Sequence, residues 1–402
     1  SREYKPLEYQ YYKNPDGSKF DFGSAYPQQE YSRDLYWYFY ENNSTLNRDE
    51  LISTVKLNAE ITPWLNAFVR TSANLISSKF EVINNVPNPD KVSDGRYEKQ
   101  LDKDKLLNTD IMVTAHKENL FINGFNASAS GMFNLYSNNS TGMMGVNDGT
   151  FIVPGIYSLE NILATDRINP DLYSVKERRY HVESQSVLAM LNLSYNDYLF
   201  LDLTGRNDIN STLTPSKNST FYPSASLSFV FTDAFNFRSK AFSYGKLRLA
   251  YGESANATDP YKLGFTYDVG SFGGVPTNSI PETLSPEELG FQTSQSMEIG
   301  TSLGFLNDRI NLDFTYYSIR SKNQILSADI APSSGAKGVT FNSGELTNKG
   351  IEFIVNAAVI QSPNFSWSLS LNGARNQNKV VSLAPGIREL RIADVFGNLG
   401  VF

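Results

Sequence analysis

Apolar and polar residues alternate along segment after segment of this chain. Residues 246–252 read Lys-Leu-Arg-Leu-Ala-Tyr-Gly, and residues 309–316 read Arg-Ile-Asn-Leu-Asp-Phe-Thr-Tyr. Because successive side chains of a β-strand point to opposite faces, a period of two predicts strands with one apolar and one polar face. The stretches 55–61, 225–231 and 366–372 repeat the pattern. The chain is therefore predicted to be all-β.

The same criterion predicts about twelve strands along the chain. They lie near residues 51–61, 65–75, 110–118, 120–136, 180–195, 198–206, 221–232, 244–253, 293–305, 309–320, 346–360 and 365–376. The segment 30–41 is a candidate for one more strand, although its aromatic residues are continuous rather than alternating.

The connections between these strands alternate between short and long. Short turns fall at 62–64, 117–119, 196–197, 306–308 and 361–364, a longer one at 233–243, and long loops near 76–109, 137–179, 207–220, 254–292 and 321–345. Membrane β-barrels pair tight periplasmic turns with long extracellular loops. A soluble sandwich or propeller, the alternative for alternating strands, has no reason to lengthen every second connection. The pattern predicts a transmembrane antiparallel β-barrel.

Aromatic residues at the short turns agree with this interpretation. Membrane barrels carry aromatic girdles where their strands meet the lipid headgroups. Aromatics at or beside the short turns include Trp64, Tyr195, Tyr198, Phe365 and Trp367. Aromatic residues also favour strands in general, so this observation adds only modest support.

Composition restricts the possible functions. Charged residues make up only 19% of the chain, the net charge is −7, and there is no cysteine. Without a basic stripe the chain has no means of neutralising nucleic-acid phosphates, and without cysteine it has no disulfide or thiolate metal site. No segment approaches the roughly 18 apolar residues of a membrane helix. A membrane location would therefore require a closed barrel.

Catalytic signatures are absent from the sequence. The only histidines are His116 and His181, and no zinc-protease, nucleophile-elbow or phosphate-loop motif occurs. The acidic pairs Asp102/Asp104 and Glu287/Glu288 are expected to be solvated in loops. We therefore expect no enzyme and no catalytic, metal or cofactor site.

The predicted loops carry aromatics suited to stacking on sugars, although each could equally pack its own loop. They are Tyr97, Phe151, Tyr157, Tyr173, Tyr267 and Phe272. The sequence alone does not assign substrate-binding residues.

Five blocks in the second half of the chain resemble one family in its own order. In order, the blocks are Gly205-Arg-Asn-Asp208 followed by Phe221-Tyr-Pro-Ser-Ala-Ser226; residues 246–252; Glu298-Ile-Gly300 followed by residues 309–317; Asn342 to Glu352; and Trp367 to Val380. These blocks resemble the SusC/RagA family of TonB-dependent transporters from Bacteroidetes. One departure is Ile209, which stands where the family usually has glycine and predicts a different loop conformation there.

The resemblance implies that this chain is the central part of a longer protein. Residues 1–402 would then belong to one transmembrane barrel domain, with the N-terminal plug and the last strands absent. About twelve strands would be part of a 22-stranded barrel, the number used by outer-membrane transporters with a plugged lumen.

The expected function is TonB-dependent active import of a large nutrient, an oligosaccharide or an oligopeptide, across the bacterial outer membrane. The resemblance also implies two partners: a SusD-like surface lipoprotein, and a TonB complex reached through parts absent from this chain. The alternatives are a passive porin or structural barrel, and a soluble glycan-binding protein. An upstream plug domain would favour the transporter, whereas a chain monodisperse without detergent would favour the soluble protein.

Overall fold

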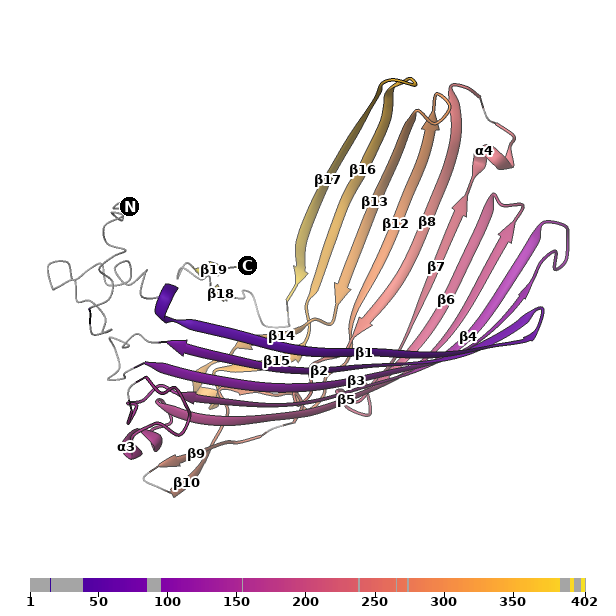
Figure 1. Cartoon of the computed structure of the whole chain (residues 1–402). Coiled ribbons are helices and arrows are strands. Elements are labelled where there is room, and N and C mark those ends of the chain that lie inside the picture. Colours follow the sequence, from indigo (N-terminus) through magenta and orange to yellow (C-terminus); the bar gives the residue numbers. More distant parts are fainter. Residues whose placement is uncertain are drawn as a thin grey trace. The chain divides into compact units, whose positions relative to one another are not determined.

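The computed structural model describes Pro15 and residues 39–84, 95–153, 155–237, 239–264, 266–272, 275–383, 391–393 and 399–401. Twelve strands form one sheet in which each strand is bonded to the next along the chain (Figure 1). In order they are β1 (Asn43–Thr62), β2 (Leu65–Asn84), β3 (Arg96–Lys117), β4 (Phe125–Asn147), β5 (Tyr173–Tyr195), β6 (Leu199–Asn210), β7 (Ser219–Phe229), β8 (Phe242–Asn256), β12 (Gln292–Phe305), β13 (Ile310–Lys322), β16 (Glu345–Gln361) and β17 (Ser366–Ser382).

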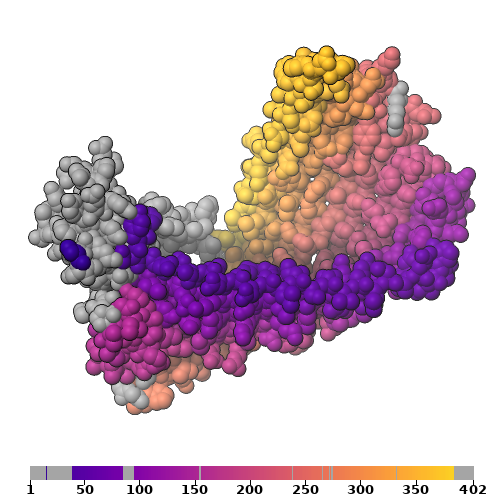
Figure 2. Space-filling view, in the orientation of Figure 1, coloured from indigo at the N-terminus to yellow at the C-terminus, as the bar shows by residue number. Residues whose placement is uncertain are grey.

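All twelve predicted strands are confirmed. From β5 to β17 each assigned register between neighbours is antiparallel, as expected for an up-and-down sheet. Within the described residues, β1 and β17 have a neighbour on one side only. Figure 2 shows the resulting edge, where the indigo side chains of β1 are exposed along almost its whole length.

Several strands are longer than predicted, so the expected long loops were too wide. β2 and β3 are separated only by residues 85–95, and β4 and β5 only by residues 148–172, which contain α3 (Ala164–Arg167). Residues 96–107, which were predicted to lie in a loop, belong to β3. The prediction missed them because Glu98 to Lys105 place charged and amide side chains on both faces of the strand. Such a strand has no apolar face from which a period of two can be recognised.

Three more of the predicted loops contain strand residues in the structure. β6 runs to Asn210, so Ile209 lies in a strand and not in the altered loop that the family comparison predicted. The other two contain small sheets: the hairpin of β9 (Asp268–Phe272) and β10 (Val275–Ser279), and a sheet of β11 (Thr283–Leu284), β15 (Gly338–Asn342) and β14 (Ile325–Asp329). A separate pair joins β18 (Arg391–Ala393) to β19 (Leu399–Val401).

The short turns are mostly as predicted. Asn196 and Asp197 have φ values of 47° and 57°, and Leu306 to Asp308 are also left-handed, which tight hairpins require. The turn expected at 117–119 is wrong, because residues 118–124 form the connection and Asn119 Oδ1 accepts a 2.7 Å bond from Gly124 N. The turn predicted near 233–243 is residues 230–241, between β7 and β8, and it contains the short helix α4 (Phe231–Ala234).

The candidate strand at 30–41 is not confirmed. Residues 39–41, the described end of this segment, are helical, and 30–38 lie outside the described residues. No helix in the described part of the chain is long and apolar enough to span a membrane. The chain divides into two compact units, residues 1–54, 72–107 and 137–181 in the first, and 55–71, 108–136 and 182–402 in the second.

In the second unit the sheet has one apolar and one polar face. Leu249 of β8 lies between Leu227 of β7 and Ile299 of β12, and the three side chains are 46%, 37% and 43% exposed. The next residue, Ala250, lies between Ser226 and Glu298 on the other face. The predicted apolar positions share the first face: Leu247, Leu249, Ile310, Leu312, Trp367 and Leu369.

A small buried cluster lies in the long connections of the second unit. Leu213, Leu289 and Phe291 pack together, with Leu263 and Ile325 against them. Apolar packing thus orders the connections, whereas the large apolar face of the sheet stays exposed.

Candidate functional site

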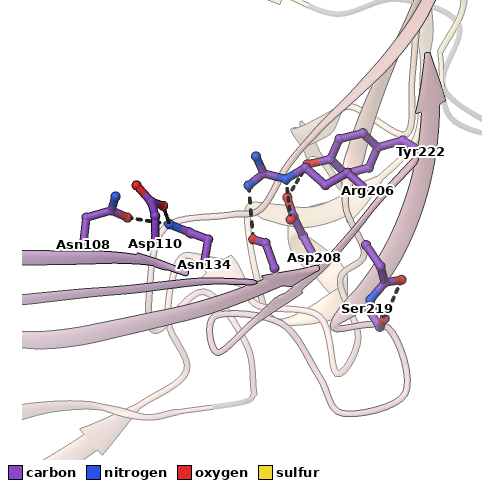
Figure 3. Close-up of polar contacts among 9 residues, drawn as sticks. Asn108, Asp110, Asn134, Arg206, Asp208, Ser219 and Tyr222 are labelled. Carbon is purple, nitrogen blue, oxygen red and sulfur yellow. Dashed lines mark hydrogen bonds and ion pairs between the residues drawn. The ribbon is translucent and has the colours of Figure 1, made fainter. Parts of the chain in front are cut away.

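The polar face of the second unit carries clusters of paired charges. Arg206 and Asp208 lie two residues apart on β6, so both project from one face, and Arg206 Nε donates a 2.6 Å bond to Asp208. Arg206 also donates to Ser186 Oγ at 3.1 Å, and Tyr222 Oη donates to Asp208 (Figure 3). Asp208 is only 8% exposed. This charge is therefore neutralised within the face rather than free for chemistry.

A second cluster connects β8, β12 and β13. Arg248 forms two parallel bonds with the carboxylate of Asp313, at 2.9 and 2.8 Å. Ser302 Oγ donates to the same carboxylate at 2.6 Å. Gly300 leaves space for the guanidinium, because a Cβ there would lie 2.9 Å from Arg248 Nη2. Bidentate pairing of this kind fixes both the position and the orientation of the arginine.

A third cluster joins β2, β3 and β4. Arg70 Nε donates to Asp110 at 3.0 Å, and Asn134 Nδ2 donates to Asp110 at 2.7 Å and to Asn108 Oδ1 at 2.8 Å. Figure 3 shows Asn108, Asp110 and Asn134 facing one another across neighbouring strands. The polar face thus offers amides, hydroxyls and neutralised charges, which suit hydrogen bonding to a polar solute.

Both histidines lie in strands. His116 lies at the end of β3, where its backbone N donates to Trp64 O at 2.9 Å. His181 lies within β5, and its Nε2 is 3.0 Å from Ser137 Oγ on β4. Over the described ranges, no group of three or more metal-binding side chains occurs.

Most of the loop aromatics pack within the protein. Phe151 is 4% exposed and meets Tyr157 edge-on at 5.5 Å, and Tyr173 lies under Arg167. Tyr97 lies in β3 and donates a 2.8 Å bond to Glu81, and burial with this bond raises the pKa of Tyr97 to about 12. Tyr267 and Phe272 remain exposed at the β9–β10 hairpin.

Aromatic side chains at the short turns form larger clusters than the sequence analysis predicted. Tyr195 and Tyr198 meet edge-on at 5.5 Å, Tyr198 contacts Phe229, and Phe229 contacts Phe235 beyond α4. A second group joins Phe231, Phe237, Phe242 and Phe305. The sequence signal for these clusters is the group of five phenylalanines between residues 229 and 242.

In the block 342–352, the structure shows the roles of Asn342 and Gly350, which the sequence analysis did not identify. Asn342 Oδ1 accepts from Gly290 N at 2.6 Å, and its Nδ2 donates to Gly290 O and Asn323 O. A Cβ on Gly350 would lie 2.5 Å from Tyr317 Oη and 2.7 Å from Arg375 O.

Of the acidic residues predicted to lie in loops, Asp102 and Asp104 lie in a strand and Glu288 lies in a loop. Asp102 lies in β3, where it pairs with Arg178 at 3.2 Å, and Asp104 lies in the same strand. Glu288 lies in a loop as predicted, and it pairs with Lys217 at 2.9 Å.

Comparison with known proteins supplies independent evidence. A family model described as the TonB-dependent receptor-like β-barrel matches residues 1–387. The chain is 29% identical over 211 residues to TonB-dependent receptor P3 of Formosa agariphila, which covers 51% of this chain and 21% of that protein. It is 30% identical over 146 residues to TonB-dependent receptor SusC of Bacteroides thetaiotaomicron, covering 36% of this chain and 13% of SusC.

Solved structures show the same fold at lower identity. The RagAB peptide importer in its open-open state is similar with a TM-score of 0.73 and 14% identity, covering 90% of this chain and 39% of that one. Its closed-closed state gives a TM-score of 0.74 and 14% identity, with 91% and 44% covered. The chain therefore spans less than half the length of these solved structures, and about a fifth or less of the two receptors named above.

Proposed function

This chain belongs to the TonB-dependent receptor-like β-barrel family, and we propose that it forms part of the wall of an active nutrient importer. The barrels of this family are outer-membrane proteins, and this chain is one of them. The family consists of receptors and transporters rather than enzymes. For this chain the proposal includes a single transmembrane barrel domain over residues 1–402 and no catalytic activity.

The observation that carries the proposal is the two-faced sheet. An exposed face of Leu, Ile and Phe is costly in water but suits hydrocarbon, and the opposite face holds neutralised charges and amides. With the apolar face toward lipid, the polar face lines the passage. Long connections then gather at the entrance, where solute is first bound.

The proposed substrate is an oligosaccharide or an oligopeptide. SusC is a TonB-dependent receptor, and RagAB is a peptide importer. The polar face suits either substrate, because both present many hydroxyl or amide groups that can replace water in hydrogen bonds. No single side chain in the described face selects between them.

The proposed partners are a SusD-like surface lipoprotein at the outer mouth, and a TonB complex contacted through segments outside this chain. The exposed hairpin of β9 and β10 supports a partner at the mouth, since Phe272 is 82% exposed there. Purification of the full-length protein from its native membrane, without crosslinking, tests this. A monodisperse barrel still competent for uptake after deletion of the neighbouring lipoprotein gene contradicts the partner.

Uptake by whole cells tests the importer itself. Strains with and without the full-length gene receive labelled oligosaccharides or oligopeptides too large for porins, in the presence and absence of a protonophore. An importer gives gene-dependent uptake that the protonophore abolishes. Gene-dependent uptake that persists after the proton gradient is removed supports the alternative, a passive porin.

A further inference from the structure

A groove of about 720 Å³ crosses strands β1 to β4 in the first compact unit. Twelve residues line it. Eight form two adjacent rows across these four strands: Leu51, Leu75, Lys105 and Asn139 in one row, and Asp49, Ser77, Lys103 and Thr141 in the other; the remaining four, Arg48, Glu50, Ile76 and Asp104, are even-numbered. The groove is distinct from the charged clusters of the polar face, none of whose residues lines it.

Residue parity places this groove on the apolar face of the strands. The polar cluster of Arg70, Asp110 and Asn134 consists of even-numbered residues on β2, β3 and β4. The bond of 3.1 Å between Thr71 and Thr109 marks the opposite, odd-numbered face. Both rows of the groove are odd-numbered, and so are the exposed apolar residues Val69 of β2 and Ile111 and Val113 of β3.

Along β3 this face changes from apolar to basic. Val113, Ile111 and Leu107 are followed, in the direction of the long connection, by Lys105 and Lys103. Both lysines are exposed, and no ion pair involves either of them within the described part of the chain.

Two other cations of this face are paired with neighbouring carboxylates. Lys79 pairs with Glu81 at 2.6 Å, and Arg179 pairs with Glu177 at 3.1 Å. Asp49 is the acidic side chain of the two groove rows, so its carboxylate offsets one of the two free lysines.

We propose that this groove binds the phosphate-bearing headgroup of an outer-leaflet glycolipid, the lipid A part of lipopolysaccharide. Leu51, Leu75 and Leu107 continue the lipid-facing surface and contact the upper acyl chains, while Lys103 and Lys105 contact the phosphate. On the face that carries the two rows, two lysines and one aspartate leave one positive charge, which suits a single phosphate; Arg48, Glu50 and Asp104 are even-numbered and belong to the opposite, polar face. The assignment rests on the proposed orientation, in which the long connections face the outside.

The test compares the full-length protein with its Lys103→Gln/Lys105→Gln variant. Each detergent-solubilised protein is titrated with phosphorylated lipid A, with dephosphorylated lipid A of the same acyl chains, and with inorganic phosphate, and bound lipid is counted by native mass spectrometry. At roughly fivefold for each lysine near a charged lipid surface, the double variant should bind phosphorylated lipid A about 30-fold more weakly. Added salt should weaken the wild-type interaction.

Two variants serve as controls. Lys176 is an exposed lysine of β5, and like Arg178 two residues later it projects from the polar face. Lys176→Gln should therefore leave lipid binding unchanged. Lys103→Arg/Lys105→Arg keeps both charges and should retain binding. Unheated gel mobility reports folding, and if the double variant does not fold, Lys103→Gln alone is compared with Lys176→Gln.

Equal affinity for phosphorylated and dephosphorylated lipid A would overturn the proposal, as would equal losses in Lys103→Gln/Lys105→Gln and Lys176→Gln. Inorganic phosphate that displaces lipid A at similar concentration would identify a free-anion site and overturn the lipid assignment. Uptake by the wild type is measured separately. A wild type that imports but binds no lipid A therefore refutes only this inference, and one that binds lipid A but does not import refutes only the importer.

Discussion

An arginine in place of Leu249 should strongly destabilise the barrel, whereas an arginine one residue later should not. Leu249 lies between Leu227 and Ile299 on the apolar face, well inside β8. Its neighbours offer no carboxylate, so a guanidinium there would face hydrocarbon. Ala250 lies between Ser226 and Glu298, and an arginine at this position has an acceptor beside it.

The expected magnitude follows from the cost of a charge in the bilayer. Arginine on the lipid face of a membrane barrel costs about 2–4 kcal/mol at the midplane and about 0–1 kcal/mol near the interfaces. Leu249 is 46% exposed on the apolar face, so the longer side chain of an arginine at this position would extend from that face into lipid. We therefore expect Leu249→Arg to cost roughly 3 kcal/mol, about a hundredfold in the folding equilibrium.

The assay is urea titration of the full-length protein in large unilamellar vesicles, with the folded fraction read from unheated gel mobility. Leu249→Arg should shift the midpoint to clearly lower urea, and Ala250→Arg should lie close to the wild type. Equal shifts in the two variants would refute the reasoning, because they would show that both faces are buried against protein, as in a sandwich.

Three further predictions concern single contacts. Gly350→Ala places a Cβ 2.5 Å from Tyr317 Oη and 2.7 Å from a backbone oxygen and should cost roughly 1–3 kcal/mol in urea titration, whereas Gly131→Ala, with open space around its Cβ, should stay within about 0.5 kcal/mol; equal effects contradict this. Asn342→Ala leaves Gly290 N without its acceptor, so hydrogen exchange at Gly290 should accelerate, and unchanged exchange would refute the role of Asn342. The pKa of Tyr97 is about 12 in the folded chain against 10.0 as its ordinary value, so its contribution to stability is complete below pH 10 and is lost as the pH rises toward 12. Tyr97→Phe should remove this alkaline loss, measured by thermal unfolding between pH 9 and pH 12, and an identical pH profile in the variant excludes the tyrosine.

The strands that cross the membrane could be predicted because their environment is two-sided. β13 alternates Ile310, Leu312 and Phe314 with Asn311 and Asp313, and the structure places these sets on opposite faces. The hairpins at Asn196 and Asn307 were predictable for a local reason, since asparagine tolerates the left-handed backbone that such turns need.

The strand extensions could not be predicted in the same way. Between Glu98 and Lys105 charged and amide side chains occupy both faces of the strand, so the sequence shows no alternation of apolar and polar residues. The cross-chain contacts were also hidden, because Asn342 reaches Gly290 across 52 positions and Arg248 reaches Asp313 across 65. Local sequence carries no signal for a bond of that separation.

The orientation of the barrel is the most direct test of the importer account, and the absence of cysteine from this chain makes it practical. Ile168→Cys lies in the long connection between β4 and β5, and Phe121→Cys lies in the 118–124 turn, whose Gly124 O accepts from Asn196 N in the next turn of the same rim. Intact cells carrying either variant are treated with a membrane-impermeant maleimide. The account predicts labelling of Ile168→Cys on intact cells, and labelling of Phe121→Cys only after the outer membrane is opened. Labelling of Phe121→Cys on intact cells, with Ile168→Cys protected, would contradict it.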